Sequence, residues 1–255
     1  MLITIITITY QAEQFVERTL QSVLHQSCND FEYVVIDGAS TDGTLDILKK
    51  HAPLFEERNI PFQWISEPDK GIYDAMNKGI HQAKGAYIWF MNAGDVIANH
   101  QVVEKIKSSI RAEASQPDFL YGETLIVDQT GNVMGERRLR APEKLDWKKF
   151  KMGMLVCHQS MVVSKSLAIP FNLNYKYSSD FDWSIRVLKN AGQIKNTHLM
   201  LSHFMDGGVS KKKMQASLKE RFQIMSIHYG AFGTAARHIW FVCRAAWFKL
   251  LHGWI

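Results

Sequence analysis

The sequence predicts an α/β fold in which polar, glycine-containing turns follow the strands. Residues 2–8, 31–36 and 88–91 are short apolar runs rich in β-branched and aromatic residues, as expected of buried strands. Helical patterns of apolar residues follow the first two runs, and a polar turn ends each of the three. Ligands of open α/β sheets bind beyond the carboxyl ends of the strands, so these turns predict a binding site.

The first two strands carry the residue types of a nucleotide site. The strand at 2–8 ends in Thr9 and Tyr10, and the strand at 31–36 ends in the turn DGASTDGT at 37–44, which opens the next helix. An aromatic ring can stack on a base, and carboxylates can accept hydrogen bonds from the base and ribose. We therefore expect a nucleotide at this edge of the sheet.

The third strand, at 88–91, ends in the turn Asn92-Ala93-Gly94-Asp95. The small residues let a ligand approach the backbone, and the single carboxylate suits a divalent cation that is otherwise held by substrate phosphates. Asp95 is thus expected to bind a metal ion or to lie beside a phosphate group.

Five motifs, taken together and in order, resemble one known family. They are VVIDGASTDGT, EPDKGIYDAMNKGI, WFMNAGD, HQS and SSDFDW. Their order and spacing over roughly the first 210 residues are similar to those of the inverting glycosyltransferases of family 2, which have the GT-A fold. The resemblance is strongest to bacterial exopolysaccharide and lipopolysaccharide transferases.

The resemblance implies a fold, a division of the chain and an activity. The fold is a Rossmann-like nucleotide-diphospho-sugar transferase with a mixed central sheet. Residues 1–210 form the transferase domain, with the nucleotide-sugar half at 1–98 and the acceptor half at 99–210, and residues 211–255 form a basic helical extension. The implied activity moves a sugar, with inversion, from a UDP-linked donor to a saccharide or polyprenyl-diphosphate-linked acceptor in cell-surface polysaccharide biosynthesis.

The resemblance also implies roles for individual residues. Tyr10 stacks on the base, Asp37 hydrogen-bonds it, Asp95 binds the Mg²⁺ or Mn²⁺ that bridges the diphosphate, and Asp180 is the catalytic base. The expected donor contacts are Thr9, Tyr10, Asp37, Ser40, Asp42, Asp69, Lys70, Gly71, Asp74, Asn77, Asn92 and Gly94; the expected acceptor contacts are His158, Gln159 and Asp182; and His203 is a second candidate metal ligand.

The sequence departs from the commonest family pattern in the third turn. Gly94 stands where a second Asp often stands, and Asn92 stands where the first does. Metal binding is therefore expected to be weaker, or metal dependence partial. Other roles stay open for the acidic residues: Asp37 and Asp42 can shape a turn and cap a helix, and Asp180 can be the N-cap of its own helix. His203 can equally be a structural histidine.

Two other classes of protein remain to be weighed. A nicotinamide oxidoreductase is disfavoured, because the turn after the first strand is Thr9-Tyr10-Gln11-Ala12 and lacks the glycine-rich fingerprint. A catalytically silent nucleotide-binding scaffold at the membrane stays open, because Gly94 replaces a carboxylate. No nucleic-acid-binding motif accompanies the basic charge, so we expect no nucleic acid partner.

The cysteines and the first residues of the chain indicate the cellular compartment in which the protein is expected. The three cysteines, Cys28, Cys157 and Cys243, are far apart and odd in number, which argues against a disulfide framework or a zinc cluster. The chain begins directly with a strand pattern, without the basic and apolar regions of a secretory signal. We therefore expect a cytoplasmic protein.

The positive charge is concentrated near the C-terminus. Residues 206–255 hold eight Lys or Arg and two Asp or Glu, a net of +6, so the first 205 residues total −1 against the overall +5. A helix over 237–255 would place its cationic side chains on one arc and Trp-rich apolar residues opposite, a pattern typical of helices that lie in a membrane interface. We expect peripheral binding to the inner face of the cell membrane; the alternative is packing on the catalytic domain or on a second copy in a homo-oligomer.

Overall fold

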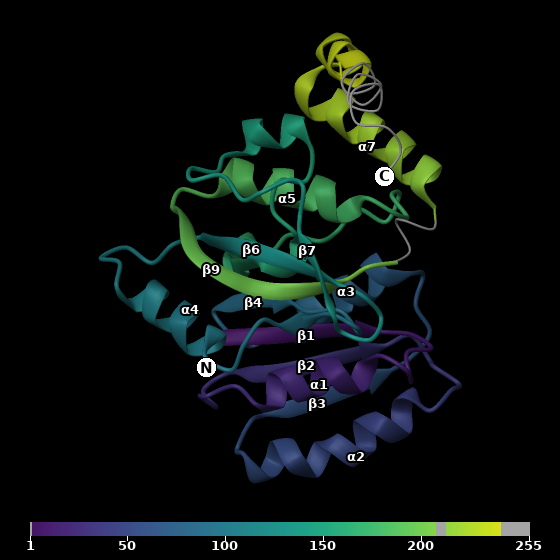
Figure 1. Ribbon diagram of the computed structural model, residues 1–255, viewed down its shortest axis with the longest axis vertical. Helices are drawn as coiled ribbons and strands as arrows, with labels where there is room; N and C mark the ends of the chain where they lie inside the picture. The colour runs from purple at the N-terminus through teal and green to yellow at the C-terminus, as the bar shows by residue number, and fades with distance from the viewer. Residues whose placement is uncertain (1, 208–212, 241–255) are drawn as a thin grey trace.

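The computed structural model describes residues 2–207 and 213–240, which form an α/β fold around one nine-stranded sheet (Figure 1). The strands follow the order β3-β2-β1-β4-β8-β6-β9-β5, and β7 pairs with β6 outside this path. Their bounds are β1 Ile3–Thr9, β2 Glu32–Asp37, β3 Phe62–Ser66, β4 Tyr87–Phe90, β5 Val96–Ile97, β6 Phe119–Val127, β7 Val133–Glu136, β8 Met161–Ser164 and β9 Ile194–Met205. The predicted α/β class with a mixed sheet is confirmed.

One half of the sheet is parallel and places the polar turns side by side. β1 pairs in parallel with β2 and β4, and β2 pairs in parallel with β3. In this register Thr9 lies opposite Asp37, and Asp37 lies opposite Ser66. β1 and β2 are buried along their whole length, as their β-branched sequences predict. The carboxyl ends of the parallel strands therefore form one edge.

The other half of the sheet contains the antiparallel strands. β8 pairs antiparallel with both β4 and β6, and β5 pairs antiparallel with β9. β6 and β9 run parallel to each other, with two register shifts near Gly122. A Cβ atom at Gly122 would lie 2.4 Å from the carbonyl oxygen of Leu199, so only glycine allows this close approach of the two strands.

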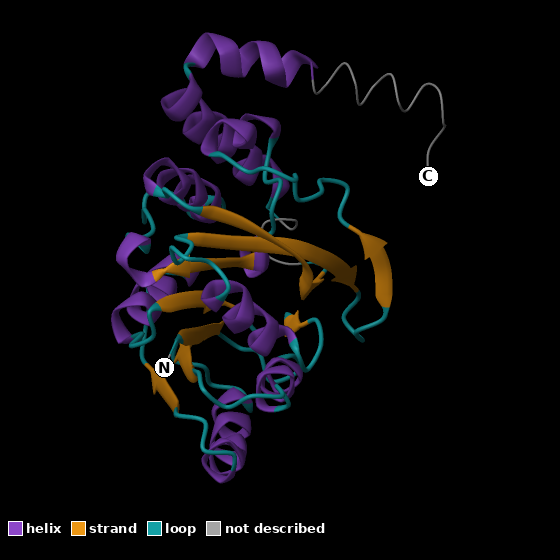
Figure 2. Cartoon of the chain, turned by 90° about the vertical axis from the view of Figure 1, so that its left-hand side faces the viewer, coloured by secondary structure: helices purple, strands orange, loops and turns teal. Residues whose placement is uncertain are grey.

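Helices cover both faces of the sheet, as Figures 1 and 2 show. α1, α2 and α4 bury their apolar residues against one face, whereas α3 and α5 pack with the other. α7 contacts α5, and Figure 1 places it on the side of α5 away from the sheet. The bounds are α1 Val16–Leu24, α2 Thr44–Glu57, α3 Ile72–Gln82, α4 Val102–Arg111, α5 Ser179–Asn190 and α7 Met214–Tyr229, with short 3-10 helices at Trp147–Met152, His158–Ser160 and Lys165–Leu167.

The C-terminal end of the described chain is helical. Residues 231–240 form a helix that follows α7, and the ring of His238 contacts that of Phe222 of α7, with 5.0 Å between the ring centroids. The remainder of the predicted interfacial helix, residues 241–255, lies outside the described residues. Within the described residues, no helix has the length and apolar character needed to cross a membrane.

Candidate active site

The edge formed by β1, β2 and the loop after β3 brings together an aromatic ring and a carboxylate. Tyr10 is 64% exposed at the end of β1. A Cβ atom at Gly38 would lie 2.5 Å from Asp69 Oδ2 and 3.3 Å from Tyr10 Cδ2, so glycine is needed for this approach. An accessible ring beside a carboxylate can stack on a flat heterocycle and accept a hydrogen bond from it.

Asp37 is fully buried beneath this edge. Its Oδ1 accepts a hydrogen bond from Ser40 Oγ at 2.5 Å, and its Oδ2 accepts bonds from the Ser40 N–H at 2.8 Å and from Ser66 Oγ at 2.6 Å. Ser40 Oγ in turn accepts from the N–H of Gln11 at 2.8 Å. The carboxylate thus fixes the turn and ties three strand ends together, which supports the turn-shaping alternative for Asp37.

Asp42 also shapes the turn. It accepts hydrogen bonds from Thr44 Oγ1 at 2.6 Å and from the N–H of Glu13 at 3.1 Å. Burial acts to raise the pKa of Asp42, but these hydrogen bonds outweigh it and lower the pKa below its ordinary value. The side chain is bound to Thr44 at the start of α2, but the N-cap of that helix is Gly43, so Asp42 shapes the turn and is not the helix cap.

Four further candidates lie in the loop before α3 and in the first turn of that helix. Asp69 Oδ1 accepts a hydrogen bond from the N–H of Gly71 at 2.7 Å, and Asp74 Oδ2 accepts one from the N–H of Lys70 at 3.0 Å. Gly71 has a φ of +113°, a conformation that favours glycine. Lys70 is exposed, so its ammonium group can reach a ligand at the strand ends.

Asn77, an expected donor contact, is bound to another segment of the protein. Its side-chain Nδ2 donates to the carbonyl oxygen of Phe171 at 3.1 Å, and its Oδ1 accepts from the Phe171 N–H at 2.7 Å. Both ends of the amide are therefore used to hold the loop that precedes α5. Asn77 therefore joins α3 to the segment before α5, and its contact with a donor stays a prediction.

Asp95 is buried where three segments meet. It is 4% exposed, and its Oδ2 accepts a hydrogen bond from Gln159 Nε2 at 2.7 Å while its Oδ1 accepts one from the N–H of Met205 at 2.8 Å. Burial raises the pKa of Asp95 to about 7, although these bonds and the charge of Arg18 act in the opposite direction. Gln159, expected beside the acceptor, is instead bound to Asp95.

Gly94 is required by the backbone of this turn. Its φ is +97°, and a Cβ atom there would lie 2.5 Å from the methyl carbon of Met205. The Gly94 N–H donates to Thr19 Oγ1 at 2.9 Å, which fixes the turn on α1. A second carboxylate at position 94 would need both a strained backbone and a displaced Met205.

The donor atoms in this turn fit a hard divalent cation. Besides the Asp95 carboxylate, the side-chain oxygen of Asn92 is buried without a hydrogen-bond partner in the described part of the chain, as is the hydroxyl oxygen of Thr9. Mg²⁺ uses few protein carboxylates and takes its remaining ligands from phosphates and water. Within residues 2–207 and 213–240, no group of three or more His, Cys, Asp or Glu side chains could hold a metal ion. Asp95 and Asn92 would therefore hold a cation only together with a diphosphate.

His203 lies on β9 opposite Val96 of β5, two residues before Met205. Its side chain is partly buried, and this burial, together with the charge of Arg18, lowers the pKa of His203 below its ordinary value. A neutral imidazole is the form that binds metals. Because it lies near Asp95, His203 stays a candidate metal ligand. Its burial is equally compatible with a purely structural role.

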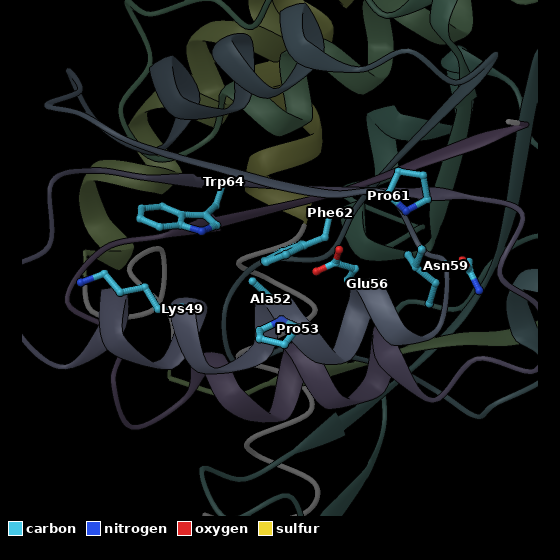
Figure 3. A pocket seen from close by; sticks show the side chains of 9 residues that line it. Lys49, Ala52, Pro53, Glu56, Asn59, Pro61, Phe62 and Trp64 are labelled. Carbon is cyan, nitrogen blue, oxygen red and sulfur yellow. The ribbon is translucent and has the colours of Figure 1, made fainter.

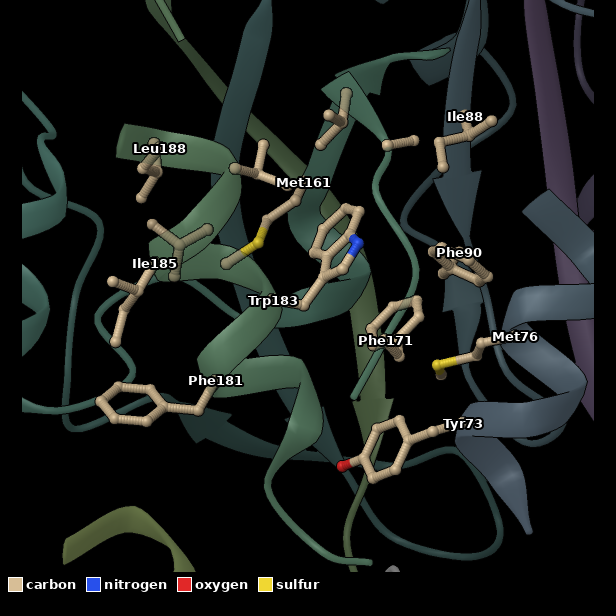
Figure 4. Packing of buried hydrophobic residues seen from close by; sticks show 14 of the residues in the cluster. Tyr73, Met76, Ile88, Phe90, Met161, Phe171, Phe181, Trp183, Ile185 and Leu188 are labelled. Carbon is tan, nitrogen blue, oxygen red and sulfur yellow. The ribbon is translucent and has the colours of Figure 1, made fainter. Parts of the chain in front are cut away.

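Asp180 is the second residue of α5 and points toward α3. Its Oδ1 accepts a hydrogen bond from the hydroxyl of Tyr73 at 3.1 Å, and Figure 4 shows the Tyr73 side chain reaching from α3. Burial and the nearby charge of Asp180 raise the pKa of Tyr73 well above its ordinary value, so this phenol stays a donor. The N-cap of α5 is Ser178, so Asp180 is not the helix cap that the alternative proposed.

His158 is a buried histidine with unsatisfied nitrogens. It is 5% exposed, and neither ring nitrogen has a hydrogen-bond partner within the described residues. Its ring stacks on Phe90 at 5.1 Å between centroids and meets Trp183 edge-on at 5.4 Å. Burial lowers the pKa of His158 to about 4, against the opposing charge of Asp180. His158 is therefore a neutral imidazole whose two nitrogens are buried without partners within the described residues.

Asp182, expected to contact the acceptor, pairs with two side chains inside the protein. It is 5% exposed, and its oxygens pair with Arg186 Nε at 2.6 Å and His228 Nε2 at 2.9 Å. Burial acts to raise the pKa of Asp182, but His228 and Arg186 together lower it. Both oxygens are used inside the protein, so Asp182 joins α5 to α7.

Two side-chain contacts of the site were not predicted from the sequence. Tyr73 lies within the motif EPDKGIYDAMNKGI, but nothing in its spacing indicates that its hydroxyl reaches Asp180. The bond from Gln159 to Asp95 spans 64 residues, and no local pattern encodes it.

A separate cavity of about 700 Å³ lies between α2 and β3 and contains none of the predicted site residues (Figure 3).

The comparisons with known proteins identify the family. The family model "Glycosyl transferase family 2" matches residues 4–168. The chain belongs to glycosyl transferase family 2. A relative named "PGL/p-HBAD biosynthesis glycosyltransferase" from Mycobacterium bovis is 31% identical over 196 residues, which cover 75% of this chain and 72% of the relative. The "putative teichuronic acid biosynthesis glycosyltransferase TuaG" of Bacillus subtilis is 22% identical, with 89% of this chain and 90% of TuaG covered. This family 2 chain is therefore a glycosyltransferase.

Solved structures confirm the GT-A fold of this family 2 glycosyltransferase. S. aureus TarS 1–349 in complex with UDP matches with a TM-score of 0.70 at 19% identity, over 89% of this chain and 65% of that chain. A longer TarS structure is covered over 40% of its length. The mannosyltransferase PcManGT from Pyrobaculum calidifontis, in complex with GDP-Man and Mn²⁺, matches with a TM-score of 0.63 at 13% identity, over 97% of this chain and 80% of that chain.

The raised pKa of Asp95 predicts a pH-dependent stability of the ligand-free enzyme. Between the ordinary carboxyl pKa of 3.8 and the raised pKa of about 7, the native state retains a proton that the unfolded chain has lost. The contribution of Asp95 to the free energy of unfolding therefore falls as pH rises through about 7. Urea unfolding at about pH 5 and about pH 8 should show wild type losing more stability than Asp95→Asn between the two. An equal change in both proteins would contradict the burial of an ionisable carboxyl.

Proposed function

We propose that this glycosyltransferase transfers a sugar, with inversion, from a UDP-sugar to a hydroxyl of a saccharide or lipid-linked acceptor, with Asp180 as the base. The observation that carries the proposal is the position of the Asp180 carboxylate. Its Oδ1 accepts a hydrogen bond from Tyr73, and its charge acts on His158, whose ring nitrogens have no partner within the described residues. A carboxylate held in this way can take a proton from an incoming hydroxyl.

The nucleotide is proposed to bind at the edge formed by Tyr10, Gly38 and Asp69. There the accessible Tyr10 ring can stack on uracil, and Asp69 can accept a hydrogen bond from it. TarS 1–349 is described in complex with UDP and with UDP-GlcNAc, which supports a UDP-linked donor for a chain of the same fold. Donor contacts then come from residues 1–98, and the base comes from residues 99–210.

The proposed displacement needs one base and a stabilised leaving group. The acceptor oxygen forms a bond to the anomeric carbon while its proton passes to Asp180, and the bond from that carbon to the diphosphate oxygen breaks, with its electron pair leaving on UDP. Asp180 and the diphosphate must then lie on opposite faces of the sugar, which gives inversion. A divalent cation held by Asp95 and Asn92, Mg²⁺ or Mn²⁺, would neutralise the charge on the departing diphosphate.

The acceptor class is proposed from the relatives. The mycobacterial relative and TuaG are named for the biosynthesis of PGL/p-HBAD and of teichuronic acid. We accordingly propose cell-surface polysaccharide or glycolipid biosynthesis. The neutral His158 is placed to hydrogen-bond a hydroxyl of the acceptor or of the transferred sugar.

The C-terminal helices are proposed to lie on a membrane surface. They expose large apolar side chains, namely Met214, Leu218, Phe222, Ile227, Phe232, Ile239 and Trp240, and Phe232 is 91% exposed. The net charge of +6 over residues 206–255 would add attraction to anionic headgroups. This placement would put the enzyme at the inner face of the membrane, next to a lipid-linked acceptor.

A catalytically silent nucleotide-binding scaffold is the alternative, and Gly94 is the observation that favours it. A screen of nucleotide-sugars, with and without Mn²⁺, separates the two. Turnover of one donor, measured as UDP release, supports the enzyme; binding of UDP without turnover of any donor supports the scaffold.

Asp180→Asn should remove basicity while keeping the shape of the side chain. We expect turnover of the donor found in the screen to fall by roughly 10²–10⁴-fold, with UDP affinity unchanged, because general-base catalysis contributes about that much. Asp46→Asn, at an exposed aspartate of α2 that pairs with Lys49, is the control and should be as active as wild type. Near-normal turnover by Asp180→Asn would rule out this base.

Asp95→Ala should abolish the enhancement of UDP binding by Mn²⁺. Calorimetric titrations of UDP with and without Mn²⁺ measure the enhancement in wild type and variant. Because the carboxylate must ionise to bind a cation, the wild-type enhancement should grow as pH rises from about 5 to about 8. If Mn²⁺ leaves UDP affinity unchanged in both proteins, Asp95 has no metal role here.

Removal of residues 237–255 should release the protein from anionic liposomes. Binding of the full chain should weaken with salt, because headgroup attraction is screened, but should persist through apolar insertion. UDP affinity of the truncated protein is the control and should be unchanged. Continued co-sedimentation would contradict the membrane role, whereas a change in oligomeric state would favour an interface between two copies.

A further inference from the structure

The segment that leads into α5 is held by a side chain from α7. Glu220 accepts three backbone hydrogen bonds, from the N–H groups of Lys176 at 2.8 Å, Tyr177 at 2.9 Å and Ser178 at 2.9 Å. These residues immediately precede α5. A carboxylate at this point accepts hydrogen bonds from these N–H groups and interacts favourably with the positive end of the helix dipole.

The helix has no side-chain cap of its own, which makes the contact from α7 more important. The N-cap residue Ser178 makes no capping hydrogen bond with its side chain. Its hydroxyl lies 2.9 Å from Ser217 Oγ of α7 and 3.2 Å from the Ser217 carbonyl oxygen. Ser178 is fully buried and Ser217 nearly so, so water does not replace these bonds. The start of α5 is thus fixed from outside the helix.

A second contact lies one turn further along α5 and about two turns further along α7. His228 of α7 pairs with Asp182 at 2.9 Å, and Lys189 Nζ lies 3.0 Å from His228 Nδ1. Asp180 therefore stands between two points at which α7 holds α5, residues 176–178 and residue 182. Any displacement of α7 would move the carboxylate of Asp180 relative to Tyr73 on α3.

We propose that Glu220 is a positioning residue for the glycosyl transfer and that α7 is part of the catalytic unit. The inference rests on the proposed role of Asp180 as the base. Glu220 contacts no substrate in this proposal; it fixes the approach of the Asp180 carboxylate to the acceptor hydroxyl. α7 lies beyond residues 4–168, which the family model matches, so the family motifs alone do not reveal this contribution.

The experiment compares variants of the full chain with the donor found in the nucleotide-sugar screen, measured as UDP release. Glu220→Ala should lower kcat by roughly 10–100-fold, since a misplacement of about 1 Å can cost that much. The KM for the donor and the affinity for UDP should stay within about twofold, because the donor edge is formed by other elements. Glu220→Gln should restore part of kcat, because its side-chain oxygen still accepts N–H groups.

Tyr229→Phe is the matched control on α7. It removes the hydrogen bond from Tyr229 to the carbonyl oxygen of Trp147, at 2.6 Å, but leaves both contacts with the start of α5. Its kcat should stay within about twofold of wild type. Ser217→Ala, which loses only the bond to the Ser178 hydroxyl, should have a smaller effect than Glu220→Ala and serves if the latter does not fold.

The outcomes separate this inference from the proposed function. If Asp180→Asn is inactive but Glu220→Ala has normal kcat, or if kcat, UDP affinity and folded fraction fall in parallel, the positioning role is wrong while the base assignment stands. Should Glu220→Ala fail to fold, an undiminished kcat in both Glu220→Gln and Ser217→Ala would overturn the positioning role. If Asp180→Asn is fully active, the proposed mechanism fails first.

Discussion

The buried carboxylate of Asp95 is the interaction on which the arrangement of the site depends. Its two oxygens bind Gln159 Nε2 and the N–H of Met205, so one side chain joins the turn after β4, the 158–160 segment and the end of β9. The cost of burying it is visible in the raised pKa, to about 7. A cation at this point would stabilise the ionised form and reduce that cost, so the proposed binding of donor and cation would be coupled to the packing of these three segments.

The other site residues divide into those whose polar atoms have partners inside the protein and those whose polar atoms remain open to a ligand. Asp37, Asp42, Asn77 and Asp182 have their polar atoms bound to neighbouring segments, so they build the frame. The other groups are the exposed ring of Tyr10, the exposed Lys70, the side-chain oxygen of Asn92, the nitrogens of His158, and the carboxylate of Asp180, which accepts from Tyr73. The proposed chemistry depends on these groups together with Asp69 and Asp95.

The strand pattern and the position of the polar turns were predictable from the sequence, whereas the partners of the acidic residues were not. The apolar runs at 2–8, 31–36 and 88–91 match β1, β2 and β4 to within one residue at nearly every boundary, because buried parallel strands have a strong local signature. Asp182 and Asp180 are two residues apart in one motif. Asp182 pairs with Arg186 of the same helix, but its second pair, with His228, exists only because α7 packs on α5. Side-chain partners distant in sequence leave no such local pattern.

The stereochemistry of the reaction tests the central claim, direct displacement with Asp180 as the base, most directly. The measurement is proton NMR of the newly formed anomeric centre during turnover of an α-linked UDP-sugar, recorded early enough to precede mutarotation if water is the acceptor. The mechanism predicts a β-configured product, formed by wild type and nearly lost in Asp180→Asn. An α-configured product would contradict single displacement and would require a different role for the carboxylate.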